Sequence, residues 1–163
     1  MSMKQFVIFS IENEKFGIEI EKVNSIEKPL EIFKVPNTPD FFEGLINLRD
    51  KVYPVVNMRK RFHLPYDGMS NDSKIIITNL DQMTAGFIVD EVSEIIRVDE
   101  EQIEETPSAL KNEGRQYLNG IAKVSIGIIL LIDPSKILSA EEIEFATAEL
   151  VNSEIANSIT QDT

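Results

Sequence analysis

The chain has 163 residues, carries 16 Lys and Arg against 28 Asp and Glu, and has a formal charge of −12. Hydrophobic residues make up 42% of it, enough for a packed core, and the absence of Cys excludes disulfides, thiolate nucleophiles and thiolate metal sites. The acidic balance argues against nucleic acid and anionic membranes as partners, and no apolar run approaches the roughly 20 residues of a membrane helix. We therefore expect a cytoplasmic protein without direct membrane insertion.

The first predicted elements are two strands joined by a tight turn. Residues 6–11 form an apolar run, residues 12–15 form a polar turn, and Gly17 opens a second apolar stretch with Val23 and Ile26 beyond it. This pattern is typical of a β-hairpin that is followed by a further strand.

A second hairpin is predicted over residues 44–57, apolar on both arms. Before it, residues 36–43 have the pattern of a helical turn that Thr38 caps and Gly44 ends. After it, Asn57 is placed to cap a short helical turn that holds the basic run Arg59-Lys60-Arg61. Residues 66–73 are rich in Asp, Gly, Asn and Ser and are predicted to be a connector.

The segment beyond the connector repeats the first in the same order. Phe6 precedes Gly17 by 11 residues, and Ile75 precedes Gly86 by 11 residues. Residues 120–133 then match residues 44–57 without a gap, and Asp133 takes the capping place of Asn57. Matching elements in one order indicate a duplication.

Charge differs sharply between the two copies. Residues 1–82 carry 11 basic and 12 acidic side chains, a net of −1, whereas residues 83–163 carry 5 and 16, a net of −11. Much of this acid lies in residues 99–105, which we interpret as an acidic turn or short helix, and after Ser139, where a capping box begins a C-terminal helix. The near-neutral copy is therefore the better candidate for recognition.

Each copy holds roughly five short strands, which indicates a small barrel or a strongly bent sheet. A unit of about 70 residues has a marginal core by itself, so the two copies are expected to pack against each other. The predicted units are residues 1–69, residues 70–138, and residues 139–163 as a C-terminal helix and tail. Strand 6–11 is free to pair across to the second unit.

Signals for enzymatic chemistry are poor. His63 is the sole histidine, so paired-histidine catalysis and multi-histidine metal sites are excluded, and its place after a helical turn favours a surface or capping role. Residues 99–105 lack the ligand spacing of a calcium loop. A distant alternative is a ligand-binding or hydrolytic barrel that uses Asp90 and Glu91, whose position after a buried strand could raise a pKa. We expect no metal and no cofactor.

Basic residues of the first copy are better suited to binding. Arg49 lies at the tip of the second hairpin, where it is either a solubilising charge or a fixed recognition group. The basic run 59–61 either complements the end of its short helix or contacts an acidic partner.

Several segments of the chain resemble the CheW family of chemotaxis coupling proteins. The resemblance covers residue 5 to about residue 145 and is carried by residues 17–23, 37–39, 44–49, 54–59 and 89–93. It implies two SH3-like five-stranded β-barrels packed side by side, with short helical turns and a C-terminal α-helix. It also implies a non-enzymatic scaffold that couples a CheA-type histidine kinase, through its regulatory domain, to the cytoplasmic tips of methyl-accepting chemoreceptors.

The resemblance also implies which residues face the receptor and the kinase. Val23 and Ile95 would supply apolar surface, Gly44 would allow a close approach of backbones, and Arg49 would fix the hairpin tip or pair with an acid. The full candidate interface is Val23, Ser25, Gly44, Leu48, Arg49, Asp50 and Ile95.

This chain departs from the family pattern at three positions. Asp50 follows Arg49 where the family usually has Gly, Ser25 stands where it often has Glu, and Asn57 replaces an Asp. An alternative with the same fold is an adaptor for another CheA-type pathway, such as surface motility. In isolation we expect a monomer, which is recruited to membrane-associated receptor arrays.

Overall fold

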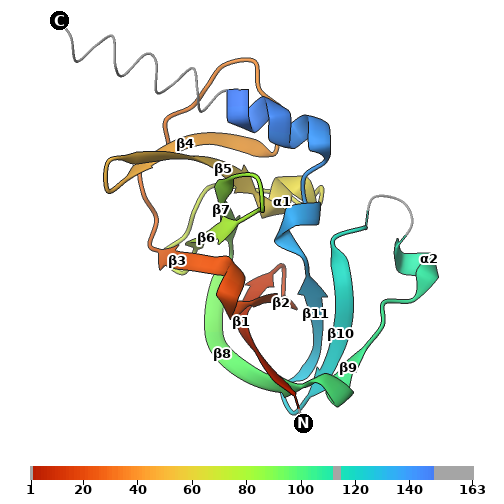
Figure 1. The fold of residues 1–163 in the computed structure, drawn as a ribbon. Helices are drawn as coiled ribbons and strands as arrows, with labels where there is room; N and C mark the ends of the chain where they lie inside the picture. The colour runs from red at the N-terminus through yellow and green to blue at the C-terminus, as the bar shows by residue number, and fades with distance from the viewer. Residues whose placement is uncertain (1, 112–114, 149–163) are drawn as a thin grey trace, which may run out of the picture.

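The computed structural model describes residues 2–111 and 115–148, and the strands within them form two sheets (Figure 1). One sheet has six strands in the order β8-β1-β2-β11-β10-β9, and the other has five in the order β3-β6-β7-β5-β4. The six-stranded sheet consists of β1 (Met3–Ile11), β2 (Glu14–Glu19), β8 (Glu91–Asp99), β9 (Ile103–Glu104), β10 (Leu118–Val124) and β11 (Gly127–Ile132). The five-stranded sheet consists of β3 (Val23–Glu27), β4 (Phe42–Leu48), β5 (Lys51–Asn57), β6 (Lys74–Asn79) and β7 (Thr84–Val89).

Helical elements are short and lie between the strands or after them. They are η1 (Ile20–Lys22), α1 (Met58–Arg61), η2 (Glu100–Gln102), α2 (Ser108–Lys111), η3 (Pro134–Lys136) and a C-terminal helix over residues 140–148. The predicted fold class, mostly β with two small barrels side by side and a C-terminal helix, is confirmed.

The duplication is visible in the strand pairing. Hairpins β1–β2 and β6–β7 are antiparallel equivalents, as are β4–β5 and β10–β11. However, β2 pairs in parallel with β11, and β7 pairs in parallel with β5, so the two copies exchange their first hairpins. Strand β1 also pairs with β8, the crossing that the sequence left open. The sheets therefore do not coincide with the segments 1–69 and 70–138, because each takes strands from both.

Alternating side chains give each barrel its own core, and a third core lies between the barrels. Ile8, Ile129 and Leu131 belong to the core of the six-stranded sheet, and Ile46 and Ile75 to that of the five-stranded sheet. The shared core is a larger cluster of 16 buried residues. It includes Phe9, Phe16, Met58, Phe87 and Ile137. Because of this shared core and the exchanged hairpins, we expect the barrels to unfold together.

The predicted helical turn at residues 36–43 is wrong. Turns occupy residues 36–37 and 40–41, β4 begins at Phe42, and Phe33 pairs with Leu45 as an isolated bridge. Asn37 has a left-handed backbone with φ 62°, and the hydroxyl of Thr38 donates back to the carbonyl of Val35 instead of capping a helix.

The other predicted caps are confirmed. The side chain of Asn57 accepts from the Lys60 amide, and that of Asp133 accepts from the Ser135 amide. Ser139 and Glu142 form a reciprocal capping box at the start of the C-terminal helix. Residues 99–105 begin with a capped 3₁₀ helix, and His63 is exposed with φ 61° just after α1. The part of the predicted tail beyond residue 148 lies outside the described residues.

Candidate functional site

The turn between β4 and β5 holds Arg49 in an unusual backbone conformation. Leu48 pairs with Lys51, which leaves Arg49 and Asp50 as a two-residue loop. Their φ angles are 53° and 66°, so both lie in the left-handed region, as a type I′ hairpin turn requires. Arginine gains nothing locally from this conformation, which costs an L-residue on the order of 1 kcal/mol. The turn therefore holds a strained arginine at its tip.

Glu27 on β3 faces this arginine. Its Oε1 lies 3.6 Å from Nη2 of Arg49, with side-chain exposures of 18% for Glu27 and 77% for Arg49. The same Oε1 is buried and accepts no hydrogen bond within the described part of the chain. The pair is thus a loose ion contact, in which the carboxylate is covered and the guanidinium faces outward with donors available.

A shallow hollow of about 210 Å³ lies beside the turn. The residues lining it are Asn24, Ser25, Leu48, Arg49, Lys51, Tyr53 and Ile77. It brings together three of the candidate interface residues, Ser25, Leu48 and Arg49, with Asp50 next to them at the turn. The hollow combines apolar side chains with polar ones, and both Arg49 and Lys51 border it.

The remaining candidate residues lie elsewhere. Val23, at the start of β3, is partly buried against the shared core. Gly44 is buried on β4, and the close approach that it allows here is that of the carbonyl of Phe33 in this same chain. Ile95 is 52% exposed on β8, in the other sheet.

Glu27 contacts Arg49 but is not among the interface residues predicted from the sequence. The burial pattern of β3 alternates, and positions 23, 25 and 27 are its partly buried members. This spacing of two was the available signal, because alternate residues of a strand lie on one side. The carboxylate that the family often places at the position of Ser25 is absent here, and Glu27 supplies one two residues later.

Replacing Asp50 with glycine is expected to stabilise the fold by about 0.5–1 kcal/mol, because glycine adopts positive φ without a steric penalty. Thermal and urea unfolding of Asp50→Gly measure this gain. Asp50→Ala is the matched control and should be destabilised, since alanine tolerates left-handed backbone less well than aspartate. Equal stability of the two variants would contradict the turn assignment.

The basic run is used within the chain. Lys60 Nζ lies 2.6 Å from Glu43 Oε1, and Arg61 donates from Nε to the carbonyl of Ile137 at 3.0 Å. Arg61 also lies 3.6 Å from Glu142, at the start of the C-terminal helix. The run therefore fixes neighbouring elements of the fold and is not an unpaired basic patch.

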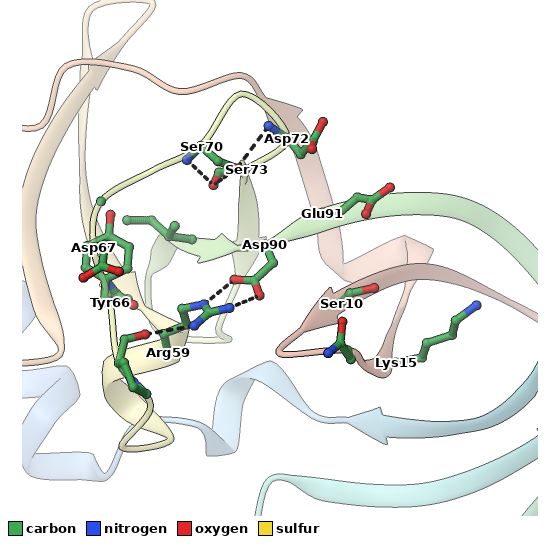
Figure 2. A pocket seen from close by; sticks show the side chains of 15 residues that line it. Ser10, Lys15, Arg59, Tyr66, Asp67, Ser70, Asp72, Ser73, Asp90 and Glu91 are labelled. Atoms are coloured by element: carbon green, nitrogen blue, oxygen red, sulfur yellow. Dashed lines mark hydrogen bonds and ion pairs between the residues drawn. The ribbon is translucent and has the colours of Figure 1, made fainter.

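Arg59 makes the densest set of contacts in the run (Figure 2). Its Nε and Nη2 donate to the two carboxylate oxygens of Asp90 at 2.8 and 2.7 Å. Its Nη1 donates to the Pro65 carbonyl at 2.9 Å and lies 2.8 Å from Glu12 Oε2. Arg59 thereby ties α1 to the β7–β8 corner, to the β1–β2 turn and to Pro65, just before the connector. These contacts lie at a polar cavity of about 600 Å³.

This pairing corrects the expected chemistry of Asp90. Burial by itself raises the pKa of Asp90, but hydrogen bonds from Arg59 and from the Glu12 amide outweigh it, so the pKa lies below the ordinary value of 3.8. A carboxyl that stays ionised and holds a guanidinium in two hydrogen bonds is no proton donor near neutral pH. A raised pKa of Asp90 was part of a distant alternative only, and the arginine that lowers this pKa comes from α1, 31 residues away in the chain.

The lowered pKa of Asp90 predicts a pH dependence of stability. Since the folded pKa lies below the unfolded value, the contribution of Asp90 is complete above about pH 5 and is lost as the pH falls through the folded pKa. Urea unfolding between pH 2 and 7 should show a smaller loss toward acid in Asp90→Asn than in the parent chain. Parallel curves for the two proteins would refute this assignment.

Two further observations concern the described residues only. Within residues 2–111 and 115–148, no group of three or more His, Cys, Asp or Glu side chains is placed to hold a metal ion. No helix in the same ranges is long and apolar enough to cross a membrane.

Two packed β-barrels, with a strained arginine turn facing outward from one of them, define a protein-binding module. Residues 5–142 match the CheW-like domain family, and the chain belongs to that family. It is 32% identical over 139 residues to the chemotaxis protein CheW of Klebsiella aerogenes, covering 85% of this chain and 84% of the relative. It is 30% identical over 146 residues to CheW of Bacillus subtilis, covering 90% and 94%.

A solved structure supports the same assignment. The scaffolding protein TtCheW from Thermoanaerobacter tengcongensis superimposes with a TM-score of 0.75 and 40% sequence identity, covering 81% of this chain and 90% of that one. The protein is thus a chemotaxis adaptor of the CheW type, a scaffold without enzymatic activity.

Proposed function

We propose that this protein couples the regulatory domain of a CheA-type histidine kinase to the cytoplasmic tips of methyl-accepting chemoreceptors, and is recruited through them to receptor arrays. The observation that carries the proposal is the Arg49 turn. Its side chain is 77% exposed, its backbone is strained, and its ion contact with Glu27 is long at 3.6 Å. Strain of this kind persists where function requires the side chain.

The proposed receptor-facing surface extends from this turn. Leu48 and Ser25 line the hollow beside Arg49, and Ile95 presents an exposed apolar side chain on the other barrel. A receptor tip is a helical hairpin, and its apolar stripe would cover such side chains while an acidic side chain replaces the long contact of Arg49 with Glu27. An interface of this kind is small to standard in area, so micromolar affinity is expected.

The test is capture of two purified partners by the full chain. One is the regulatory domain of a CheA-type kinase, and the other is a soluble fragment of a chemoreceptor tip. Receptor fragments from several pathways, including surface motility, assign the circuit. Absence of binding to the kinase domain and to every receptor fragment would refute the proposal.

Arg49→Ala is expected to reduce capture of the receptor fragment by at least tenfold while shifting Tm by less than about 2 °C, because an exposed ion contact contributes little to stability. Binding is measured by titration calorimetry and Tm by scanning calorimetry. Lys28→Ala removes an exposed cation next to β3 and is the matched control, which should bind normally. A large fall in Tm for Arg49→Ala would assign a structural role to Arg49.

A further inference from the structure

One apolar face of the second barrel is uncovered. Ile128 on β11 is 62% exposed, and Ile126 in the preceding turn is 40% exposed. Ile121, which pairs with Leu130 across β10 and β11, is half-buried on the same face as Ile128, whereas Leu130 is packed against the shared core. We call Ile121 and Ile128 the β10–β11 outer face.

The first barrel contains an equivalent face, and the duplication fixes the correspondence. Gly44 and Gly120 have φ angles of 144° and 147°, and each marks a register shift in its hairpin. Counting from these two glycines, Leu45, Val52 and Pro54 on β4–β5 correspond to Ile121, Ile128 and Leu130. The burial patterns agree, since Ile46 and Val55, like Ala122 and Leu131, point to the opposite, inner side.

In the first barrel this face is covered by a helix. The C-terminal helix over residues 140–148 lies across β4 and β5 (Figure 1). Ala146 is buried against Phe42 and Leu45, with Val52 packed beside them. The ring of Phe145 meets that of Phe42 edge to face at a centroid distance of 5.7 Å. The fold thus shows what this face binds: the apolar stripe of a short amphipathic helix.

The second barrel lacks a covering helix because the chain after α1 leads to β6 and forms no helix there. The C-terminal helix follows η3, and the equivalent chain after α1 turns at His63, with φ 61°, and enters the connector to β6. The start of this segment covers part of the second barrel, because the ring of Phe62 lies 5.3 Å from that of Tyr117 and 5.7 Å from that of Phe16, next to Leu130. The connector does not cover Ile128, which stays 62% exposed.

Charge around the face favours a basic partner. The parallel register of β2 and β11 pairs Phe16 with Leu130, which places Glu14 beside Ile128. Glu14 is exposed, whereas the nearby Lys123 is neutralised by Glu104 at 2.9 Å. Such a border attracts cationic side chains of a docked helix.

We propose that the β10–β11 outer face is a docking site for an amphipathic helix of a partner protein, whose apolar stripe is edged by Lys or Arg. The helix occupies the second barrel as residues 140–148 occupy the first. This site is separate from the Arg49 turn, which lies on the first barrel, and it does not depend on the function proposed above.

The test uses a designed helix as the probe. It is a peptide of residues 139–150 in which Glu141, Glu144 and Glu149 are replaced by Lys, held helical by a staple on its polar side. The peptide is titrated into the ¹⁵N-labelled full chain and followed by NMR and fluorescence anisotropy. Shift changes are expected in residues 118–132 and around Glu14, with a dissociation constant in the micromolar range.

Variants decide the outcome. Ile128→Asp should weaken peptide binding at least tenfold and Glu14→Lys at least threefold, whereas Phe33→Asp, an exposed apolar residue of the first barrel, should bind normally. Absence of binding, shifts on β4–β5 instead, or an equal loss in Phe33→Asp would overturn the proposal. Loss of capture of the kinase regulatory domain by Ile128→Asp would also overturn the proposal, because the face would then bind a β-barrel and not a helix. Capture of the receptor fragment by Ile128→Asp reports on the proposed function separately.

Discussion

Arg59→Ala is expected to lower the free energy of unfolding by about 2–3 kcal/mol, because it leaves partly buried carboxylates without their partner. The side chains of Arg59 and Asp90 are 27% and 29% exposed, so solvent replaces the lost contacts only in part. For a chain of this size the corresponding fall in Tm is roughly 5–10 °C. Scanning calorimetry and urea unfolding at neutral pH measure it.

The size of this effect follows from what Arg59 connects. The guanidinium joins Asp90, Glu12 and the Pro65 carbonyl, which come from three separate parts of the chain. Asp90 itself accepts from the Glu12 amide and donates its own amide to the carbonyl of Ser10 on β1. Loss of the guanidinium therefore loosens the place where the exchanged hairpin β1–β2 meets the β7–β8 corner.

Two variants make the prediction for Arg59 specific. Arg49→Ala removes an equal charge from an exposed position and should leave the free energy of unfolding within about 0.5 kcal/mol of the parent. The double variant Arg59→Ala/Asp90→Asn should recover part of the loss, since no unpaired carboxylate then remains at position 90. If Arg59→Ala and Arg49→Ala were equally stable, the network around Arg59 would have no role in stability.

The sequence indicated the barrels and their hairpins because periodicity and turns are local signals. The equal spacing from Phe6 to Gly17 and from Ile75 to Gly86 predicted two hairpins that the structure contains as β1–β2 and β6–β7. The exchange of these hairpins was not predictable in the same way. Strands β2 and β7 are buried on both faces at residues 16–18 and 85–89. A continuous apolar run indicates that a strand is buried, but it does not indicate which strand is its neighbour in the sheet.

In the candidate site around Arg49, too, the local features were predictable from the sequence and the long-range contacts were not. Arg49 was found because a two-residue turn between apolar arms is a local signal, and Asp50 fits the left-handed backbone that this turn requires. Glu27 and the partners of Arg59 were not found, because each contact joins residues far apart in the chain. Arg59 and Asp90 are 31 residues apart, and only the folded arrangement shows that the basic run is already neutralised.

Gly44→Ala is expected to be more damaging than Arg59→Ala, lowering the free energy of unfolding by about 3–5 kcal/mol. Gly44 has a φ of 144°, a backbone conformation available almost only to glycine. A Cβ at this position would lie 2.3 Å from the carbonyl oxygen of Phe33. That oxygen accepts from the Leu45 amide at 2.9 Å, so the backbone cannot move away without losing the bridge that attaches residues 28–35 to β4.

Two other glycines separate the contribution of the contact from that of the backbone angle. Gly68 has a φ of 108°, but an added Cβ would have open space around it, so Gly68→Ala should lower the free energy of unfolding by only about 1–2 kcal/mol. Gly120 lies at the equivalent register shift, and an added Cβ there would be less crowded, 3.0 Å from Ile103 Cγ2 and 3.3 Å from the carbonyl oxygen of Glu104. The loss of stability in Gly120→Ala should therefore lie between those of Gly68→Ala and Gly44→Ala. Chemical unfolding of the three variants should give this order. If Gly44→Ala were no worse than Gly68→Ala, the approach of Phe33 would not be what requires glycine there, and close contact with a partner would become the better explanation for Gly44.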